Sequence, residues 1–329
     1  MAEDVLSDLL KTVRLTGAAY FEVEAAEPWV AEQPPSDIVL RKVLPGATNL
    51  IAYHVVTEGR CLTTMLDGGK TLELEAGEVI VYPRGDAHVM SSRAGMRAAP
   101  VPPETFEAVA ASRLPFFVNY GNGPATARLV CGFLACDAQP FNPLIEALPP
   151  MIKSGDPRGG DNGWLGQFIR VARMESANRR AGGESILSKL SELMFIEVVR
   201  RHLESLPPEQ SGWLAGLRDP LVGKALSLMH GKPAERWTIE ELARQVGTSR
   251  SVLAERFTQL VGTPPLHYLA KWRMQIALGM LGGGNANMAT IASEIGYDSE
   301  AAFSRAFKKL MGKPPSAWRR KPNAEGAAA

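Results

Sequence analysis

The stretch ARQVGTSRSVLAERFTQLVGTPP, residues 243–265, decides the fold of the C-terminal part of the chain, because it returns as ASEIGYDSEAAFSRAFKKLMGKPP at residues 292–315. Glycine, serine, phenylalanine, leucine and the final proline pair recur at matching positions. The second copy has one extra residue in its turn. Such internal similarity indicates a duplicated structural unit.

Each copy reads as a short helix, a turn at Gly247 or Gly296, and a second helix that begins at Ser249 or Ser299. Glycine tolerates the positive φ that ends a helix, and a serine hydroxyl caps the free N–H groups of the next one. The pattern predicts two helix-turn-helix units. Apolar residues at spacings of three and four predict a connecting helix over residues 266–281, long enough to set the two recognition helices about one DNA turn, ~34 Å, apart.

The second helix of each copy leaves one face free of apolar residues, where small side chains stand beside long polar ones. Such a face suits a helix that enters a DNA major groove ~12 Å wide. The sequence therefore predicts that double-stranded DNA is contacted by Arg250, Ser251, Ala254, Glu255, Glu300, Ala301, Ala302, Ser304, Arg305, Lys308 and Lys309. Within this set we expect Arg305 to read bases, and Lys308 and Lys309 to bind phosphates.

Charge is distributed unevenly along the chain. The net charge is only +1, but residues 220–329 hold 15 Lys and Arg against 8 Asp and Glu, a net charge of +7, which leaves −6 for the rest. A basic domain joined to an acidic one favours a polyanion bound by one half only. Chance variation in surface charge is the alternative.

Length and composition set the frame for both halves. With 329 residues, of which 45% are hydrophobic, the chain has room for two domains with separate cores. It contains no run of about 18 apolar residues, and its start is acidic where a secretory signal is basic. Three cysteines without a CxxC pattern suit a reducing compartment. We expect a cytoplasmic protein.

The N-terminal half shows short β-type runs broken by Gly and Pro over residues 39–133. These runs predict an antiparallel barrel or sandwich. The segment GEVIVYPRGDAHVMS, residues 77–91, resembles the second half of the cupin pattern. Its glycine and proline residues predict the two ends of one strand, with His88 opening the next. The expected fold class is therefore α+β, with a cupin-like barrel followed by an all-α domain. Residues 93–115 have little alternation and are expected to form a long loop, a possible lid over the barrel.

The barrel sequence is poor in metal ligands. Metal-dependent cupins carry two histidines separated by one residue and a glutamate before the motif, whereas only His54 and Glu58 stand nearby here. Two imidazoles and one poorly placed carboxylate make a thin ligand set. We expect no metal, no cofactor and no catalytic residues. The alternatives are a metal-dependent cupin enzyme with a DNA-binding appendage, and an architectural DNA binder without an effector.

The C-terminal segments WTIEELARQVGTSRSVLAERF, PPLHYLAKWRM and IGYDSEAAFSRAFKKLMGKPPSAWRR resemble the DNA-binding domain of the AraC/XylS family over about residues 219–320. The resemblance implies a sequence-specific transcription regulator that inserts residues 249–261 and 299–311 into successive major grooves. It also implies an N-terminal cupin-like domain that binds a small-molecule effector, a homodimer, and RNA polymerase as a partner. Glu255 departs from the basic or amide residue often found at such a position.

The resulting domain prediction has five parts, followed by a prediction of the effector site. The parts are a cupin-like effector domain (1–142), a helical dimerisation segment (143–206) with helices at 164–180 and 184–206, a linker (207–218), the DNA-binding domain (219–320) and a disordered tail (321–329). Aromatic or polar residues on or near barrel strands are the candidates for binding the effector: Trp29, Tyr53, His54, Tyr82 and His88. Core packing is the alternative role for each of them.

Overall fold

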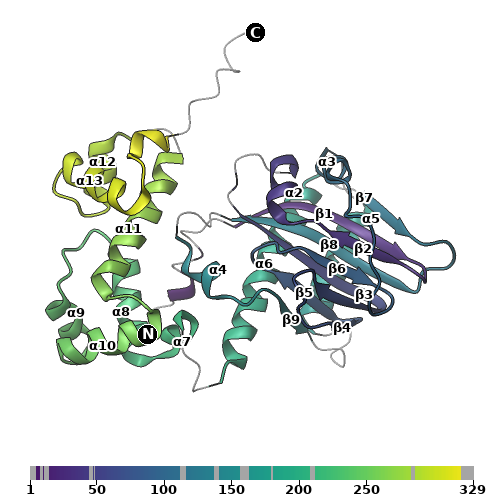
Figure 1. The fold of residues 1–329 in the computed structure, drawn as a ribbon, viewed down its shortest axis with the longest axis horizontal. Coiled ribbons are helices and arrows are strands. Elements are labelled where there is room, and N and C mark those ends of the chain that lie inside the picture. Colours follow the sequence, from purple (N-terminus) through teal and green to yellow (C-terminus); the bar gives the residue numbers. More distant parts are fainter. Residues whose placement is uncertain are drawn as a thin grey trace, which may run out of the picture. The chain divides into compact units, whose positions relative to one another are not determined.

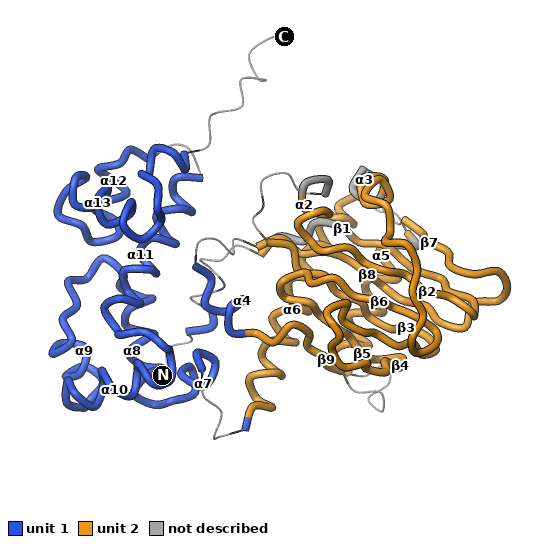
Figure 2. The backbone as a smooth tube through the Cα atoms, in the orientation of Figure 1, with its two compact units in different colours: residues 1–13, 138–147, 207–329 blue, residues 14–137, 148–206 orange. Residues whose placement is uncertain are grey.

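The computed structural model falls into two compact units (Figures 1 and 2). It describes residues 5–7, 10, 15–43, 47, 49–111, 116–136, 141–155, 163–178, 181–207, 212–282 and 286–319. The sheet unit contains residues 14–137 and 148–206, and the helical unit contains residues 1–13, 138–147 and 207–329. The predicted tail, 321–329, lies outside the described residues. No helix in the described ranges is long and apolar enough to cross a membrane.

The sheet unit is built on nine strands that curl around β3. The strands are β1 (Thr16–Ala25), β2 (Val30–Gln33), β3 (Asn49–Met65), β4 (Leu72–Glu75), β5 (Glu78–Tyr82), β6 (His88–Ser91), β7 (Phe116–Tyr120), β8 (Ala127–Cys136) and β9 (Ile152–Gly155). They pair in the order β2-β6-β3-β8-β1-β7, while β4 and β5 add to β3 and β9 adds to β5. All pairs are antiparallel except β1 with β7. The predicted cupin-like sheet is confirmed.

The segment that resembled a cupin forms the predicted strand, turn and strand. Gly77 and Gly85 adopt φ values of 89° and 62°, and β5 lies between them. A Cβ on Gly85 would stand 2.3 Å from the carbonyl oxygen of Leu50, so the close approach of the two backbones requires glycine there. His88 opens β6 as expected and is fully buried.

The helices described in the sheet unit are α2 (Ser36–Val43), α3 (Pro103–Ala111), α5 (Trp164–Asn178) and α6 (Gly183–Ser205). α6 packs on β1, β8 and β9 and against α5, at the positions predicted for these two helices. The expected loop over residues 93–115 is wrong in its second half, where α3 packs on α2 and β1. Proline at the first helical position and a run of good helix formers explain α3.

The helical unit contains the two predicted helix-turn-helix pairs. Its helices are α4 (Pro143–Ala147), α7 (Trp213–Arg218), α8 (Pro220–Gly231), α9 (Ile239–Val246), α10 (Arg250–Val261), α11 (Pro265–Gly282), α12 (Met288–Glu294) and α13 (Glu300–Met311), followed by the 3-10 turn Pro315–Ala317. Ser249 Oγ accepts from the N–H of Val252 at 3.3 Å, and Ser299 Oγ accepts from Ala302 at 3.2 Å. Both predicted N-caps, and the connecting helix α11, are confirmed.

The units differ from the predicted domain ranges in two places. Residues 138–147, predicted to divide between the cupin-like domain and the dimerisation segment, cluster with the helical unit, where α4 packs on α7. The range predicted as a linker, 207–218, contains α7, whose Trp213 and Leu214 are buried. Apolar side chains in both segments therefore enlarge the core beneath the first helix-turn-helix pair.

Candidate effector cavity and nucleic-acid interface

A cavity lies inside the sheet unit, between the curled sheet and α3. Its volume is about 40 Å³. Its apolar lining consists of Phe21, Val23, Ala31, Met90, Val101, Phe106, Val118 and Leu129. Its other lining residues are Trp29, Gln33, His54, Thr105, Tyr120 and Cys131. Because about 10–15 Å³ on this measure holds one water, the cavity holds a few water molecules or a very small ligand.

A buried chain of hydrogen bonds runs beside the cavity. Nδ1 of His88 lies 2.8 Å from the carbonyl oxygen of Asp86, the Nε2 atoms of His88 and His54 are 2.8 Å apart, and Nδ1 of His54 lies 2.9 Å from Sγ of Cys131. Burial lowers the pKa of His88 to about 4, and burial together with His88 lowers the pKa of His54 well below its ordinary value. Both imidazoles are therefore neutral at neutral pH.

Neutrality fixes the direction of every bond in this chain. The carbonyl of Asp86 only accepts, so Nδ1 of His88 carries its proton and Nε2 of His88 accepts. His54 then donates from Nε2 and accepts at Nδ1 from the Cys131 thiol, whose pKa burial raises well above its ordinary value. Each ring nitrogen thus has a partner, and neither imidazole has a free lone pair for a ligand.

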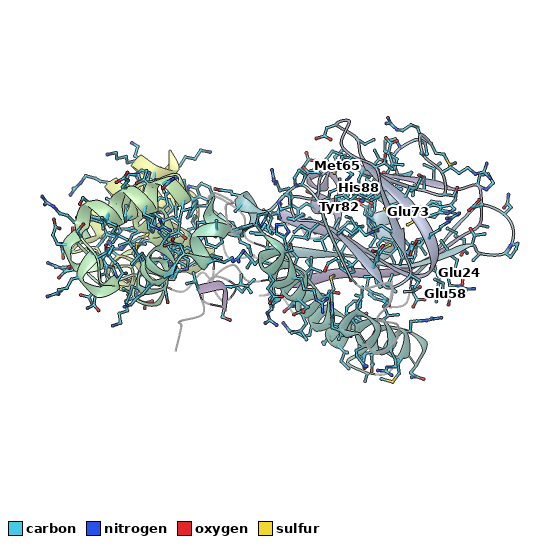
Figure 3. All side chains as sticks on the ribbon, turned by 90° about the horizontal axis from the view of Figure 1, so that it is seen from below. Glu24, Glu58, Met65, Glu73, Tyr82 and His88 are labelled. Atoms are coloured by element: carbon cyan, nitrogen blue, oxygen red, sulfur yellow. The ribbon has the colours of Figure 1, made fainter. Side chains whose placement is uncertain are left out.

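The five predicted effector residues occupy three different surroundings. Trp29 and His54 line the cavity. Tyr82 and His88 stack with ring centroids 3.6 Å apart, and Figure 3 shows them close to Met65 inside the sheet unit. Tyr82 Oη also hydrogen-bonds to Thr63. Tyr53 lies on the opposite face of β3, where its hydroxyl is 2.7 Å from Oγ of Ser191 in α6. Sequence reasoning missed Gln33, Tyr120 and the α3 residues.

All three thiols of the chain lie in the interior of the sheet unit. Cys61, Cys131 and Cys136 are free and buried. Burial raises the pKa of Cys61 to about 12, with a smaller contribution from Glu78. A protonated, inaccessible thiol reacts slowly with oxidants, so these residues have the properties of packing groups.

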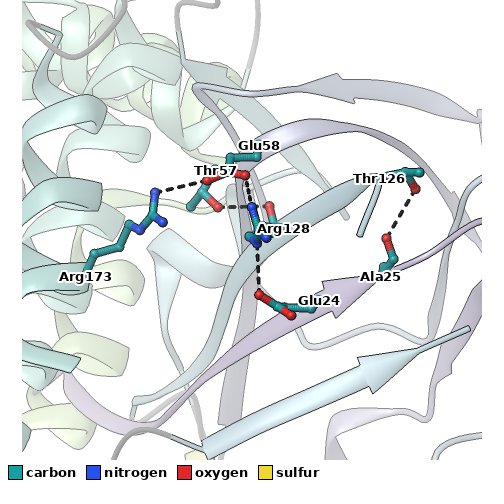
Figure 4. Close-up of polar contacts among 7 residues, drawn as sticks. All are labelled: Glu24, Ala25, Thr57, Glu58, Thr126, Arg128 and Arg173. Carbon is teal, nitrogen blue, oxygen red and sulfur yellow. Dashed lines mark hydrogen bonds and ion pairs between the residues drawn. The ribbon is translucent and has the colours of Figure 1, made fainter. Parts of the chain in front are cut away.

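An ion-pair cluster on the surface ties three strands to α5 (Figure 4). Arg128 of β8 donates from Nε to Glu24 of β1 at 2.9 Å and from Nη1 to Glu58 of β3. Arg173 of α5 donates to the other Glu58 oxygen at 3.3 Å. All four side chains are substantially exposed, so solvent screens the pairs and they add little stability. Glu58, considered above as a metal ligand, is engaged in this cluster.

Within the described ranges, no group of three or more His, Cys, Asp or Glu side chains is arranged to hold a metal ion. His54 and His88 come together as a pair, but the third neighbour of the pair is the protonated Cys131 thiol. Within the described residues, the two imidazoles and the thiol are therefore engaged in hydrogen bonds with one another.

The predicted DNA-contacting residues lie on α10 and α13, and none of them is fully buried. In the first unit Arg250 pairs with Glu240 at 3.2 Å, and Ser251 Oγ lies 3.1 Å from Oγ of the capping serine. In the second unit Arg305 is exposed and makes no hydrogen bond or ion pair with any described residue. Lys308 and Lys309 are exposed in the last turn of α13.

A further arginine of α10, Arg256, is taken up by the fold. It donates to Asp219 at 2.6 Å, and the same carboxylate caps α8 through the N–H groups of Leu221 and Val222. The Arg256 guanidinium and these N–H groups lower the pKa of Asp219 despite its burial. Arg256 therefore holds α10 against α8, which leaves other side chains of α10 for a nucleic acid.

Comparison with known proteins assigns the family. The Cupin family model matches residues 4–204, and the Helix-turn-helix domain model matches residues 242–321. A putative AraC-like transcription regulator of Streptomyces antibioticus is 33% identical over 279 residues, 84% of this chain and 89% of that protein. The regulator AlkR of Acinetobacter baylyi is 27% identical over 318 residues, 96% of this chain and 99% of that protein.

A solved structure, the DNA-binding domain of AdpA in complex with a target DNA, is 28% identical. It covers 31% of this chain and 90% of its own, with a TM-score of 0.29. The long matches to the cupin model and to the AraC-like regulator agree with the curled sheet and the paired helix-turn-helix units described above. The chain therefore belongs to the AraC-like transcription regulators, with an N-terminal cupin domain and a DNA-binding helix-turn-helix domain.

Proposed function

We propose that this regulator binds a specific DNA sequence as a homodimer, under the control of a small molecule held in the cavity of the sheet unit. The observation that carries DNA recognition is the pair of capped helices α10 and α13, each with an exposed polar face. The cavity supports an effector, because its lining combines apolar side chains with a few polar ones. The proposal also includes action in the cytoplasm, through RNA polymerase and without catalysis, and the similarity to transcription regulators supports it.

Charge reversal in the full-length chain tests where DNA binds. Lys308→Glu combined with Lys309→Glu removes two phosphate contacts, so we expect weaker binding to every duplex and a salt slope lowered by about 2. Fluorescence anisotropy at several salt concentrations measures both. The matched control, Arg60→Glu with Lys70→Glu, makes the same charge change on exposed residues of the sheet unit. If the control weakened DNA binding as much as the Lys308 and Lys309 substitutions, the proposal that the helical unit binds the DNA would be wrong.

The outer stripe of α6 supports a second copy of this chain as the dimer partner. Ile186 and Leu193, seven residues apart on one helical face, are 39% and 62% exposed, and Met174 of α5 is 45% exposed. Apolar residues at this spacing suit an antiparallel or parallel pair of helices.

Sedimentation of a variant tests the dimer. We expect Leu193→Glu to convert dimers to monomers, because it places a carboxylate in the apolar stripe. Leu266→Glu is the matched control, since Leu266 is 42% exposed in the helical unit. An unchanged sedimentation coefficient for Leu193→Glu would show that this face of α6 is not the dimer interface.

Residues 141–147 support a route for the effector signal. They follow β8, which carries the cavity residues Leu129 and Cys131, yet they fold into the helical unit. There the Phe141 ring packs edge-on against Tyr268 at 5.6 Å, and the ammonium of Lys271 lies 5.3 Å from its centroid. A shift of β8 on ligand binding would pull on residues 141–147. The pull would reach α11, because Tyr268 and Lys271, the two residues that contact Phe141, belong to that helix.

A further inference from the structure

Among the described residues, no charged side chain lines the cavity of the sheet unit. The nearest candidate for a cation, His54, is held neutral by burial and by His88, which together lower its pKa. A ligand carrying a carboxylate or an ammonium group would lose its hydration without gaining a counter-ion. The loss of hydration makes the burial of such an unpaired charge strongly unfavourable. The lining therefore selects against ionised molecules.

Two polar groups of the lining have unused hydrogen-bonding capacity. Gln33 is 9% exposed, and its side-chain amide has no hydrogen bond to any described residue. Nε1 of Trp29, on a side chain that is 3% exposed, is buried without a partner among the described residues. The two imidazole nitrogens of His54 and the thiol of Cys131 are already engaged with one another and with His88. A ligand oxygen that accepts a hydrogen bond from the Gln33 amide would give this buried donor the partner that it lacks.

From this lining we infer that the effector is an uncharged, mainly apolar small molecule with one oxygen acceptor, such as a ketone or an alcohol, that hydrogen-bonds to the Gln33 amide. The inference rests on the proposed effector control and narrows it to a chemical class. Trp29 and Tyr120, stacked with centroids 6.1 Å apart, supply a flat apolar wall for the body of the molecule. The indole N–H of Trp29 is the second donor within the same lining.

One wall of the cavity is formed by α3 and by the residues just before it. Val101 lines the cavity from the segment before α3, and Thr105 and Phe106 line it from α3 itself. That segment is held to β2 by the Arg97–Glu32 ion pair at 2.8 Å and by the Val101 N–H, which donates to the Glu32 carbonyl at 2.8 Å. Since the enclosed volume is only about 40 Å³, a ligand of nine or so heavy atoms enters by displacing this wall.

Four nearly isosteric benzene derivatives test the class with the full-length protein. Acetophenone is neutral with an oxygen acceptor, benzoate is an anion, benzamidine is a cation, and cumene is a hydrocarbon. We expect acetophenone to bind most tightly and cumene more weakly, with no detectable binding of benzoate or benzamidine at the same concentrations. Isothermal titration calorimetry gives the affinities.

The variant Gln33→Met removes the amide at nearly constant volume. We expect it to weaken acetophenone roughly two- to tenfold, the value of one hydrogen bond, and to leave cumene unchanged. Cumene binding thus doubles as proof that the variant is folded. Tighter binding of a charged compound, no binding by any of the four, or equal acetophenone affinity in the variant each overturns the inference. DNA affinity measured on the same preparations tests the proposed regulator separately.

Discussion

Replacing Phe141 by alanine is expected to lower the stability of the helical unit by about 3 kcal/mol, the cost of removing a buried phenyl ring. The ring is only 9% exposed and packs on Tyr268. Tyr268 is fully buried and is bonded through its hydroxyl to Trp213 Nε1 at 3.2 Å and to His230 Nε2 at 2.8 Å. The cavity left by Phe141 would therefore open against the centre of that unit.

Differential scanning calorimetry resolves which unit is affected. For a unit of this size the expected loss lowers the melting temperature by roughly 6–12 °C. The transition of the sheet unit should stay in place. Phe117→Ala is the matched control, because Phe117 on β7 is 52% exposed and its removal should cost little. A Phe141→Ala protein that lost the sheet transition instead would show that residues 141–147 fold with the barrel.

The placement of this segment in the helical unit could not be predicted from the sequence. The helix-turn-helix pairs were predictable because their apolar spacing, their glycine turns and their serine caps are local signals that agree with one another. Residues 141–147 carry no such agreement, since a single five-residue helix has no periodicity to detect. Their placement depends on long-range contacts with α7 and α11, which no local pattern encodes.

In the sheet unit, the alternation of side chains along a strand is a sequence signal that separates two of the predicted effector residues. Successive residues of a strand point to opposite faces, so Tyr53 and His54 could never share one cavity. Alternation along β3 places Ala52, His54 and Val56 on the cavity side and Tyr53 toward α6. The remaining lining residues, such as Gln33 and Tyr120, come from strands whose order in the sheet the sequence does not reveal. The family resemblance supplied the fold, whereas the site required the pairing of β2, β6 and β3.

Sequence preference is expected to depend on Arg305 more than on any residue of the first unit. Arg250 is held by Glu240 and Arg256 by Asp219, whereas the guanidinium of Arg305 has no partner among the described residues and stands on the exposed face of α13. Ala301 is also exposed on α13, so a groove wall can approach closely. A free arginine there can donate two parallel hydrogen bonds to guanine O6 and N7, worth ~1–3 kcal/mol of discrimination.

Two alanine variants separate base reading from phosphate binding. Arg305→Ala should weaken the cognate site roughly 5- to 150-fold and remove the preference at one base pair, because the bidentate contact is lost. Lys308→Ala should weaken all sequences alike and lower the salt slope by about 1, because it releases one phosphate. Competition binding against a set of single-base operator variants compares them. If the Arg305→Ala protein kept the wild-type preference at every base pair, Arg305 would not recognise a base. Arg250 of the first unit would then be the next residue to substitute.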